Sequence, residues 1–345
     1  MRVFILKPDA IGDFILASGC IRLIAREEGE ENLVLAVRSD VASLAQSQFP
    51  KAKIIPLPLR EVRRIVNVAT VNVINCLPSW LRMASMRVDT AICLRSMRAY
   101  LHTIFFYTPR ARRRIACENL LLADPRVRRP AVENFVRNFF KPTLLPYPAA
   151  GDLPTDIEAN KIVTAELLGR EMTSSEILPR LIPPRPIEPS TSWLLCPFSS
   201  KTSKDYPAEA WAEAIKLVEP LRNGAPLHLA AGPEQRERLE EFAATLRSSG
   251  VDHLHIDAPV PLSAFLQNVA EAKLILTVDT AAAHMACALG TRAIVVSAGK
   301  QPGVYAPYSP NGRQTWLLPP RGLSKGEWRQ HITPKKIAAA IEALL

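Results

Sequence analysis

The sequence predicts an α/β protein made of two doubly wound domains, each with a parallel β-sheet covered by helices. Apolar runs of strand length alternate with helical patterns along the chain, which is typical of βαβ units. The length of 345 residues suits two domains. A proline-rich segment at residues 178–192 interrupts the alternation, and such segments form extended linkers. We therefore expect domains at residues 1–178 and 190–345.

Short apolar segments are the expected strands. In the first half they are Val3–Leu6, Leu33–Val37, Ile54–Pro56, Val71–Cys76 and Thr90–Leu94. In the second half they are Trp193–Cys196, Leu227–Ala230, His253–Ile256, Lys273–Val278, Ala293–Ser297 and Thr315–Leu318. Helices are expected at about residues 157–172 and at Pro334–Leu345. Ligands of such sheets bind beyond the carboxyl ends of the strands, so functional residues are expected in the loops there.

The composition indicates a soluble protein of a reducing compartment. Hydrophobic residues make up 48% of the chain, but no apolar run approaches the roughly 20 residues of a membrane-spanning helix. Met1 and Arg2 lead directly into a strand pattern and not into a secretory signal. The six cysteines are scattered, without a Cys-x-x-Cys pair, so we expect buried thiols and neither disulfides nor metal ligands. A cytoplasmic location is expected.

Basic charge is concentrated in the first half of the chain. The net charge is +10, and residues 1–150 contain 23 Lys and Arg against 12 Asp and Glu. Arginine predominates, as in the run from Arg110 to Arg114, and its forked guanidinium suits phosphate groups. This indicates an anionic partner, which is a nucleic acid, an acidic membrane surface or a phosphorylated acceptor. The alternative is a solvated surface with salt bridges.

Residues 277–290 predict an anion site at the start of a helix. An apolar strand ends at Val278, and Gly290 ends the helix that follows. Thr280 suits the N-cap, because its hydroxyl can accept from a first-turn amide. The three alanines Ala281, Ala282 and Ala283 leave these amides uncovered, so amides and helix dipole together attract an anion such as a diphosphate. Asp279 and His284 lie at the rim of this site. The alternative is a buried crossover helix with a good cap.

The loop after the first strand predicts a second functional position. Gly12 permits a tight turn, and Asp13 follows at the start of a helix. There a carboxylate is stabilised by the helix dipole alone, but it can also remove a proton from a hydroxyl group as a general base. Asp9 is the second candidate. Gly-x-Gly-x-x-Gly and Gly-x-x-x-x-Gly-Lys-Ser/Thr motifs are absent from the sequence, which argues against a standard dinucleotide site or P-loop.

Several separated motifs resemble glycosyltransferase family 9, the ADP-heptose:lipopolysaccharide heptosyltransferase family. They are Gly12-Asp13, the loop from Cys196 to Trp211, and Asp-Thr-x-x-x-His-x-Ala-x-Ala-x-Gly at 279–290. The resemblance implies the GT-B architecture, in which two Rossmann-like domains face a cleft. It also implies that the last helix packs back toward the first half. This chain has Ala281 where the family usually has glycine.

The resemblance implies a role for each matching residue. Asp13 matches the general base, and Lys204 matches the lysine that binds the donor phosphates, with Lys201 as its competitor. Glu234 matches an acidic residue that binds ribose hydroxyls, and Val260 a residue that contacts the base. Residues 298–312 match a loop of the nucleotide pocket. The other matching donor-site positions are Ser199, Ser200, Asp279, Thr280, Ala281, Ala282, Ala283 and His284.

These observations predict an inverting, metal-independent glycosyltransferase. Its co-substrate would be an ADP-activated heptose or related sugar, with no further cofactor. The acceptor would be a phosphorylated saccharide or a lipid-linked core at the inner membrane surface, bound by Arg60, Arg63 and Arg64. One alternative is a UDP- or GDP-sugar transferase or epimerase of the same architecture. Another is a basic nucleic-acid-binding protein, although few aromatic residues accompany the arginines, so no nucleic acid is expected as a partner.

Overall fold

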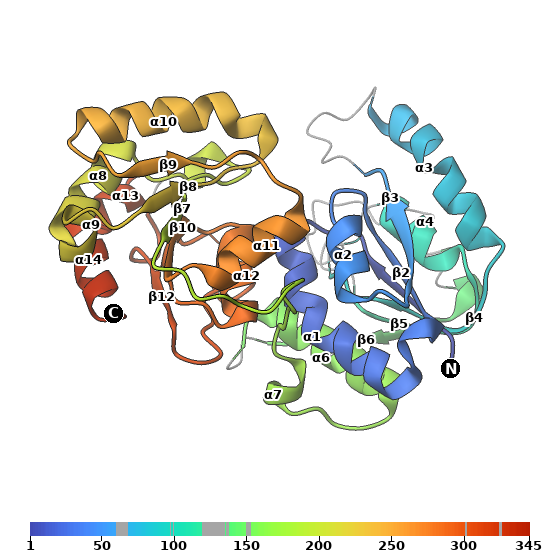
Figure 1. Ribbon diagram of the computed structural model, residues 1–345. Coiled ribbons are helices and arrows are strands. Elements are labelled where there is room, and N and C mark those ends of the chain that lie inside the picture. Colours follow the sequence, from blue (N-terminus) through green and yellow to red (C-terminus); the bar gives the residue numbers. More distant parts are fainter. Residues whose placement is uncertain are drawn as a thin grey trace. The chain divides into compact units, whose positions relative to one another are not determined.

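The computed structural model describes residues 1–59, 68–96, 98, 100–118, 135, 138–149, 153–300, 302–323 and 326–345. The chain divides into two compact units. The first comprises residues 1–179 together with 303–305, and the second comprises residues 180–302 and 306–345. Within the described residues, each unit holds one six-stranded sheet, and every strand pair in both sheets is parallel (Figure 1).

The first sheet has the strand order β3-β2-β1-β4-β5-β6. This order reverses direction between the central strands β1 and β4, which makes the space beyond their carboxyl ends a ligand position. β1 ends at Lys7 and β4 ends at Cys93. The strands are β1 (Val3–Lys7), β2 (Leu33–Arg38), β3 (Lys53–Leu57), β4 (Arg87–Cys93), β5 (Arg110–Cys117) and β6 (Thr143–Leu145).

Helices cover both faces of this sheet (Figure 1). Phe4 and Leu6 of β1 share a hydrophobic core with residues of α3 and α4. The alternate side chains of β1 point to the opposite face, where α1 packs against α6 and α7. The helices are α1 (Ile11–Glu28), α2 (Ala42–Gln48), α3 (Val68–Ala84), α4 (Tyr100–Tyr107), α6 (Thr155–Leu168) and α7 (Ser174–Ile177).

The second sheet repeats this topology, with the order β12-β11-β10-β7-β8-β9. Its order reverses between β7 and β10, and these strands end at Cys196 and Val278. The Thr277 hydroxyl on β10 donates to the Cys196 carbonyl at 3.1 Å, which ties the two strand ends together. The strands are β7 (Trp193–Cys196), β8 (Leu227–Leu229), β9 (Leu254–Ile256), β10 (Leu274–Val278), β11 (Ala293–Val296) and β12 (Gln314–Leu317).

The core of the second unit lies between the sheet and the helices α8, α10 and α14. Trp193 and Trp211 are fully buried there. The last helix, which the family resemblance placed against the first half, buries Ile337 and Ile341 in this same core. The helices are α8 (Ala208–Leu217), α9 (Glu219–Arg222), α10 (Arg236–Ser248), α11 (Leu262–Glu271), α12 (Ala281–Leu289), α13 (Trp328–His331) and α14 (Pro334–Glu342).

Most predicted strands are confirmed to within one or two residues, but Val71–Cys76 is wrong. These residues form part of α3, in which Cys76, Ser79 and Met83 are buried while Leu77 is exposed. The burial spacing is helical, and a short apolar run cannot distinguish a strand from a helix. In addition, neither β5 nor β6 was predicted, because β5 begins in a run of arginines and β6 lies in a proline-rich stretch.

The basic run at 110–114 forms β5, so part of the positive charge serves the fold. Arg114 is buried, its guanidinium lies 4.6 Å from the Phe140 ring centroid, and it donates to the Pro109 carbonyl at 2.6 Å. Burial lowers the pKa of this arginine. All six cysteines are free and buried, as predicted. In the part of the chain that the structure describes, no helix is both long enough and apolar enough to span a bilayer.

Candidate functional site

The predicted site residues follow the central strands of the two sheets. Asp13 comes after β1, and the others come after β7, β8, β9 or β10. Because the carboxyl ends of parallel strands meet at one edge of a sheet, residues far apart in the sequence become neighbours within each unit.

In the second unit, Lys204 and Asp279 form an ion pair. The Lys204 ammonium lies 2.8 Å from the Asp279 carboxylate. Lys204 ends a short 3-10 helix at Thr202–Lys204 in the loop after β7, and Asp279 directly follows β10. Both side chains retain contact with solvent, at 22% and 11% exposure. The pair therefore brings a cation and a carboxylate to an accessible position at the strand reversal.

Two residues that the sequence analysis missed hold the loop after β7 in place. The Asp205 carboxylate is buried and accepts from the Ser199 amide at 2.8 Å and from the Arg238 guanidinium at 2.6 Å. That guanidinium also lies 3.9 Å from the Phe198 ring centroid. The Ser199 hydroxyl accepts from the Lys201 amide at 3.1 Å. Ser199 is thus buried and used internally, whereas Ser200 is exposed.

The helix α12 begins as predicted, but without the predicted side-chain cap. Thr280 is its N-cap, with an extended φ of −147°, and its hydroxyl accepts no first-turn amide. Its carbonyl instead accepts the Ala283 amide at 3.1 Å. Within the described part of the chain, the amides of Ala281 and Ala282 have no protein acceptor. These amides are available to a ligand, and the dipole of α12 favours an anionic one.

Ala281 adopts ordinary helical backbone. Of the described non-glycine residues, Lys141 alone has a positive φ, so the methyl group of Ala281 causes no backbone strain. Its remaining effect is steric. Ala281 is partly exposed, whereas Ala282 and Ala283 are buried. Gly290 ends α12 in the left-handed conformation, at a φ of 76°.

His284 is buried beside aromatic rings. Its ring stacks on Tyr308 with centroids 5.9 Å apart and lies 6.1 Å from the Trp316 ring centroid. The Nδ1 atom is 3.4 Å from the Tyr308 hydroxyl. Burial raises the pKa of Tyr308 well above its usual value, so the phenol stays protonated. Tyr308 of the loop at 298–312 and Trp316 of β12 thus both lie beside the His284 ring.

Glu234 and Val260 lie in loops farther along the same edge. Glu234 is exposed in a 3-10 turn at Pro233–Gln235, and the neighbouring Gln235 side chain donates to the Ser199 carbonyl at 3.3 Å. This links the turn to the loop after β7. Val260 is 42% exposed between β9 and α11. Since β9 is an edge strand two positions from β7, Val260 is the more remote of the two.

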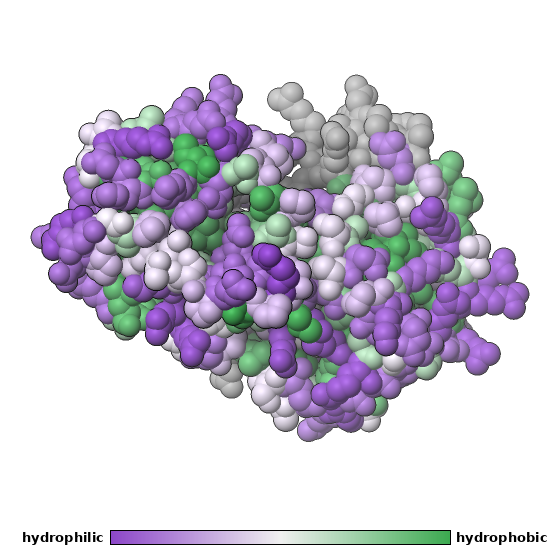
Figure 2. Space-filling model, viewed as in Figure 1, coloured by the Kyte–Doolittle hydropathy of each residue, from purple (hydrophilic) through white to green (hydrophobic). Residues whose placement is uncertain are grey.

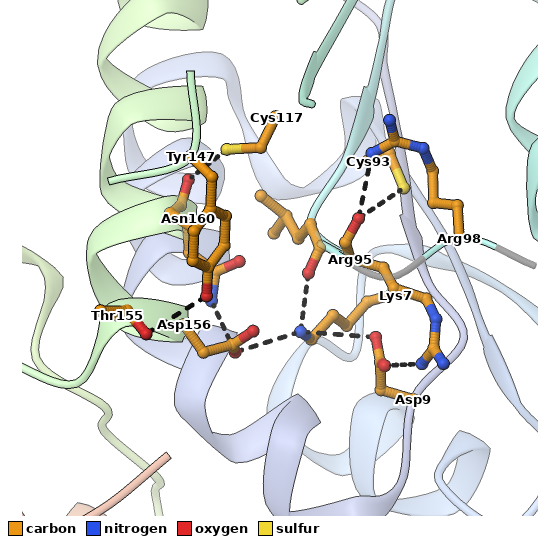
Figure 3. Close-up of polar contacts among 12 residues, drawn as sticks. Lys7, Asp9, Cys93, Arg95, Arg98, Cys117, Tyr147, Thr155, Asp156 and Asn160 are labelled. Atoms are coloured by element: carbon orange, nitrogen blue, oxygen red, sulfur yellow. Dashed lines mark hydrogen bonds and ion pairs between the residues drawn. The ribbon is translucent and has the colours of Figure 1, made fainter. Parts of the chain in front are cut away.

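In the first unit, Asp13 lies in the first turn of α1 and is partly exposed. A buried polar cluster lies where the strand order reverses between β1 and β4 (Figure 3). Two of its residues, Lys7 and Asp9, precede Asp13 in the sequence. Its centre is Lys7, which is only 1% exposed. The Lys7 ammonium donates to the Leu94 carbonyl at 2.6 Å and lies 3.4 Å and 3.5 Å from the carboxylates of Asp9 and Asp156. Two carboxylates thus balance this buried cation.

The cluster includes further cations from the end of β4. The Arg95 guanidinium pairs with Asp9, and the buried Arg98 donates to the Arg95 carbonyl at 3.1 Å (Figure 3). Burial lowers the pKa of Arg95. On α4, burial and then the charges of Arg95 and Arg98 lower the pKa of His102 to about 3, so this imidazole is neutral. Asp9 therefore serves in an internal ion-pair network, which leaves Asp13 as the more accessible carboxylate.

The start of α6 completes this cluster. Asp156 lies in its first turn and also accepts from the Asn160 amide at 3.4 Å, while the Tyr147 hydroxyl donates to Thr155 at 3.2 Å (Figure 3). Sequence reasoning missed these residues because they are brought to β1 only by the packing of α6. The one local signal was a lysine ending an apolar strand. The predicted acceptor residues Arg60, Arg63 and Arg64 lie outside the described residues.

Among the described residues, no group of three or more His, Cys, Asp or Glu side chains is arranged to hold a metal ion.

Residues 122–329 match the sequence model of glycosyltransferase family 9, described as heptosyltransferase. No curated protein sequence matches the chain.

Several solved structures are similar over the whole chain. E. coli heptosyltransferase WaaC with ADP has a TM-score of 0.72 at 16% identity, covering 100% of both chains. E. coli ADP-heptose lps heptosyltransferase II has a TM-score of 0.72 at 16% identity, covering 100% of this chain and 98% of its own. A family 9 glycosyl transferase from Veillonella parvula DSM 2008 has a TM-score of 0.71 at 14% identity, covering 99% and 96%. At these identities the likeness establishes the fold, which is that of the two doubly wound sheets described above.

Proposed function

Because the chain belongs to glycosyltransferase family 9 and is therefore a glycosyltransferase, we propose that it transfers a heptose or related sugar from an ADP-activated donor. The acceptor is a hydroxyl group of an anionic, lipopolysaccharide-core-type saccharide. The observation that carries the proposal is the Lys204–Asp279 pair beside the start of α12. Structures of the similar WaaC contain ADP and ADP-2-deoxy-2-fluoro heptose, which supports an adenine nucleotide.

The second unit binds the donor in this proposal. Lys204 and the amides of residues 281–284 receive the diphosphate, and their charge and dipoles stabilise the negative charge that grows as the diphosphate leaves. Thr280, Ser200 and His284 add hydrogen-bonding groups at this edge. Glu234 accepts from the ribose hydroxyls, because a carboxylate suits a vicinal diol. Val260 contacts the base. No metal ion is needed to offset the leaving-group charge.

Asp13 in the first unit acts as the general base. Its carboxylate removes the proton of the acceptor hydroxyl as the hydroxyl oxygen forms a bond to the anomeric carbon. The bond between that carbon and the diphosphate oxygen breaks, and its electron pair departs with the nucleoside diphosphate. Attack comes from the face opposite the leaving group, so the anomeric configuration inverts. Partial exposure of Asp13 supports this role over the buried Asp9.

The first unit also makes peripheral contact with an anionic membrane that carries the acceptor. An exposed apolar face on α3 supports this, formed by Leu77, Trp80 and Leu81 at 48%, 38% and 55% exposure. Hydrophobic side chains over α3 are visible at the right edge of Figure 2. Arg82 and Arg87 are exposed beside the end of this helix. Tryptophan, leucine and arginine together are typical of a surface that lies in a lipid headgroup layer.

Calorimetric titration with ADP, UDP and GDP, first without metal and then with Mg²⁺, tests the proposal. We expect selective, metal-free binding of ADP that is weakened by Lys204→Ala and retained in Asp13→Asn. Transfer from ADP-heptose should be lost in Asp13→Asn. A preference for UDP or GDP would retain the fold and overturn the heptose assignment. Binding of no nucleotide would overturn the transferase proposal and favour the nucleic-acid alternative, which predicts steeply salt-dependent affinity for DNA or RNA.

A further inference from the structure

The turn that carries Lys204 receives hydrogen bonds from a distant segment of the same unit. Lys204 is the last residue of the 3-10 helix Thr202–Lys204. The backbone bonds of this turn run from the Lys204 amide to the Lys201 carbonyl at 2.8 Å and from the next amide to the Thr202 carbonyl at 3.1 Å. The carbonyls at the end of such a short helix need donors from outside it. The position of the lysine therefore depends on other elements of the fold.

Two consecutive residues of α13 supply these donors. The Trp328 indole nitrogen donates to the Ser203 carbonyl at 3.3 Å. The Arg329 Nε atom donates to the Asp205 carbonyl at 3.0 Å. Ser203 and Asp205 are the two chain neighbours of Lys204. The backbone is thus held on both sides of the lysine, by residues that lie more than 120 positions later in the sequence.

Arg329 spans the turn with a forked contact. Its Nη2 atom donates to the Thr202 carbonyl at 3.4 Å, in addition to the bond from its Nε atom to Asp205. The guanidinium also lies 5.4 Å from the ring centroid of Trp328, which is buried in the core of the second unit. A planar guanidinium holds its donors in a rigid fork, whereas a lysine ammonium is a compact point charge on a flexible stem. Arg329 therefore bridges the two ends of the turn.

Other elements of the second unit fix the side chains beside this bridge. The buried Asp205 carboxylate is paired with Arg238 of α10 at 2.6 Å. The Lys204 ammonium is held at 2.8 Å by Asp279, which follows β10. The backbone of the turn is thus bound from α13, its carboxyl end from α10, and the lysine head from the residue after β10.

We propose that Arg329 is a positioning residue for Lys204, because it fixes the backbone of the turn from which the ammonium reaches the donor diphosphate. This inference rests on the proposed function, in which Lys204 binds that diphosphate. A lysine on a fixed turn loses less conformational freedom when the diphosphate binds, and its charge is already in place when negative charge grows on the leaving group. Arg329 acts through Lys204 and does not itself touch the donor.

The test is a double-mutant cycle in the full chain. Calorimetry gives the Kd for ADP in the parent protein, Arg329→Met, Lys204→Ala and the double variant. Arg329→Met removes the guanidinium and keeps an apolar stem at a partly exposed position. We expect it to raise the Kd roughly 3- to 10-fold when Lys204 is present. In the Lys204→Ala background it should change the Kd less than about twofold, because positioning has no effect once the positioned residue is absent.

Two further variants separate positioning from charge and from general stability. Arg329→Lys retains the positive charge but loses the fork, so it should weaken ADP binding nearly as much as Arg329→Met. Arg247→Met removes an exposed arginine from α10 in the same unit, and its Kd should stay within about twofold of the parent value. Urea unfolding of each variant shows that binding is measured on folded protein.

Three results would overturn the positioning role. They are an unchanged Kd in Arg329→Met, full retention of ADP affinity in Arg329→Lys, and an equal fold-change from Arg329→Met with and without Lys204. The last would show that the arginine acts independently of the lysine. If the parent protein bound no ADP, or Lys204→Ala bound it as tightly as the parent, the proposed function would fail whatever the effect of Arg329.

Discussion

The ammonium of Lys204 lies 2.8 Å from the carboxylate of Asp279, although 75 positions separate the two residues. The cause is the topology of the second sheet, in which β7 and β10 are hydrogen-bonded neighbours at the point where the strand order reverses. The pair fixes the lysine beside the open amides of α12. A fixed cation near a helix start stabilises a diphosphate better than a mobile one, because less side-chain freedom is lost on binding.

Replacing Lys204 should therefore weaken ADP binding. We expect Lys204→Ala to raise the Kd for ADP roughly 10- to 100-fold, the range for a lost hydrogen bond to a charged group. Lys201→Ala is the matched control, because Lys201 is exposed and lies three residues earlier in the same loop. The Kd of this variant for ADP should stay within about twofold of the parent value. Calorimetry at constant ionic strength measures both. A larger effect at Lys201 than at Lys204 would reverse the assignment.

The methyl group of Ala281 should not obstruct the donor. Since Ala281 has ordinary helical backbone, Ala281→Gly should mainly cost helix stability, about 0.5–1 kcal/mol, with ADP affinity within about threefold. Ala208→Gly, at the first residue of α8, should lower stability similarly and leave ADP binding unchanged. Urea unfolding and ADP titration measure the two effects. Tenfold tighter ADP binding in Ala281→Gly would show that the methyl group does narrow the phosphate position.

Stability should depend on pH through His102. Its pKa in the folded protein is lowered to about 3 by burial, then by Arg95 and Arg98, whereas an unfolded histidine titrates near 6.5. Between these values the unfolded chain binds the additional proton, so the free energy of unfolding falls as pH decreases through 6.5. The free energy of unfolding should fall less between pH 7.5 and pH 5 in His102→Gln than in the parent protein, by roughly 1–2 kcal/mol.

Urea unfolding at the two pH values gives this difference directly. His331→Gln is the control, because His331 is exposed on α13. If the parent and His102→Gln lost equal stability on acidification, His102 would not be held neutral in the folded state.

The strands and the motif-bearing loops could be predicted because their signals are local. Trp193–Cys196 and Leu274–Val278 are short apolar runs followed by polar loops, and the structure retains both as β7 and β10. Val71–Cys76 was wrong because an apolar run has the same appearance in a half-buried helix. The arginines of β5 were interpreted as binding an anionic partner, with a solvated surface as the alternative, but Arg114 packs over Phe140.

The polar cluster around Lys7 could not be predicted, because its contacts are made only in the folded chain. Lys7 meets Asp156 across 149 positions, through the packing of α6 on α1. Gly303 and Val304 accept backbone hydrogen bonds from Thr155 and Asp156 at the start of α6, and such backbone bonds leave no residue pattern in the sequence apart from Gly303. By contrast, Asp13 and Thr280 occupy helix starts, which have recognisable local sequences.

The exposed face of α3 should bind anionic membranes. Leu77 and Leu81 are separated by one helical turn and are 48% and 55% exposed, so both can enter a headgroup layer. Leu77→Ser with Leu81→Ser should lower the partition coefficient onto vesicles of phosphatidylglycerol and phosphatidylcholine roughly 10-fold. Binding of the parent should weaken with added salt, because Arg82 and Arg87 contribute electrostatic attraction.

The matched control for α3 is the double change Leu217→Ser with Ile187→Ser, which removes two similarly exposed apolar side chains, at 45% and 47%, from the second unit. Co-sedimentation should show little loss for this control, and ADP affinity should be unchanged in both doubles. Equal losses of vesicle binding in the two double variants would indicate nonspecific hydrophobic adsorption. Full retention of vesicle binding without Leu77 and Leu81 would exclude α3 as the contact surface, and the acceptor would then have to be reached without this helix entering the headgroup layer.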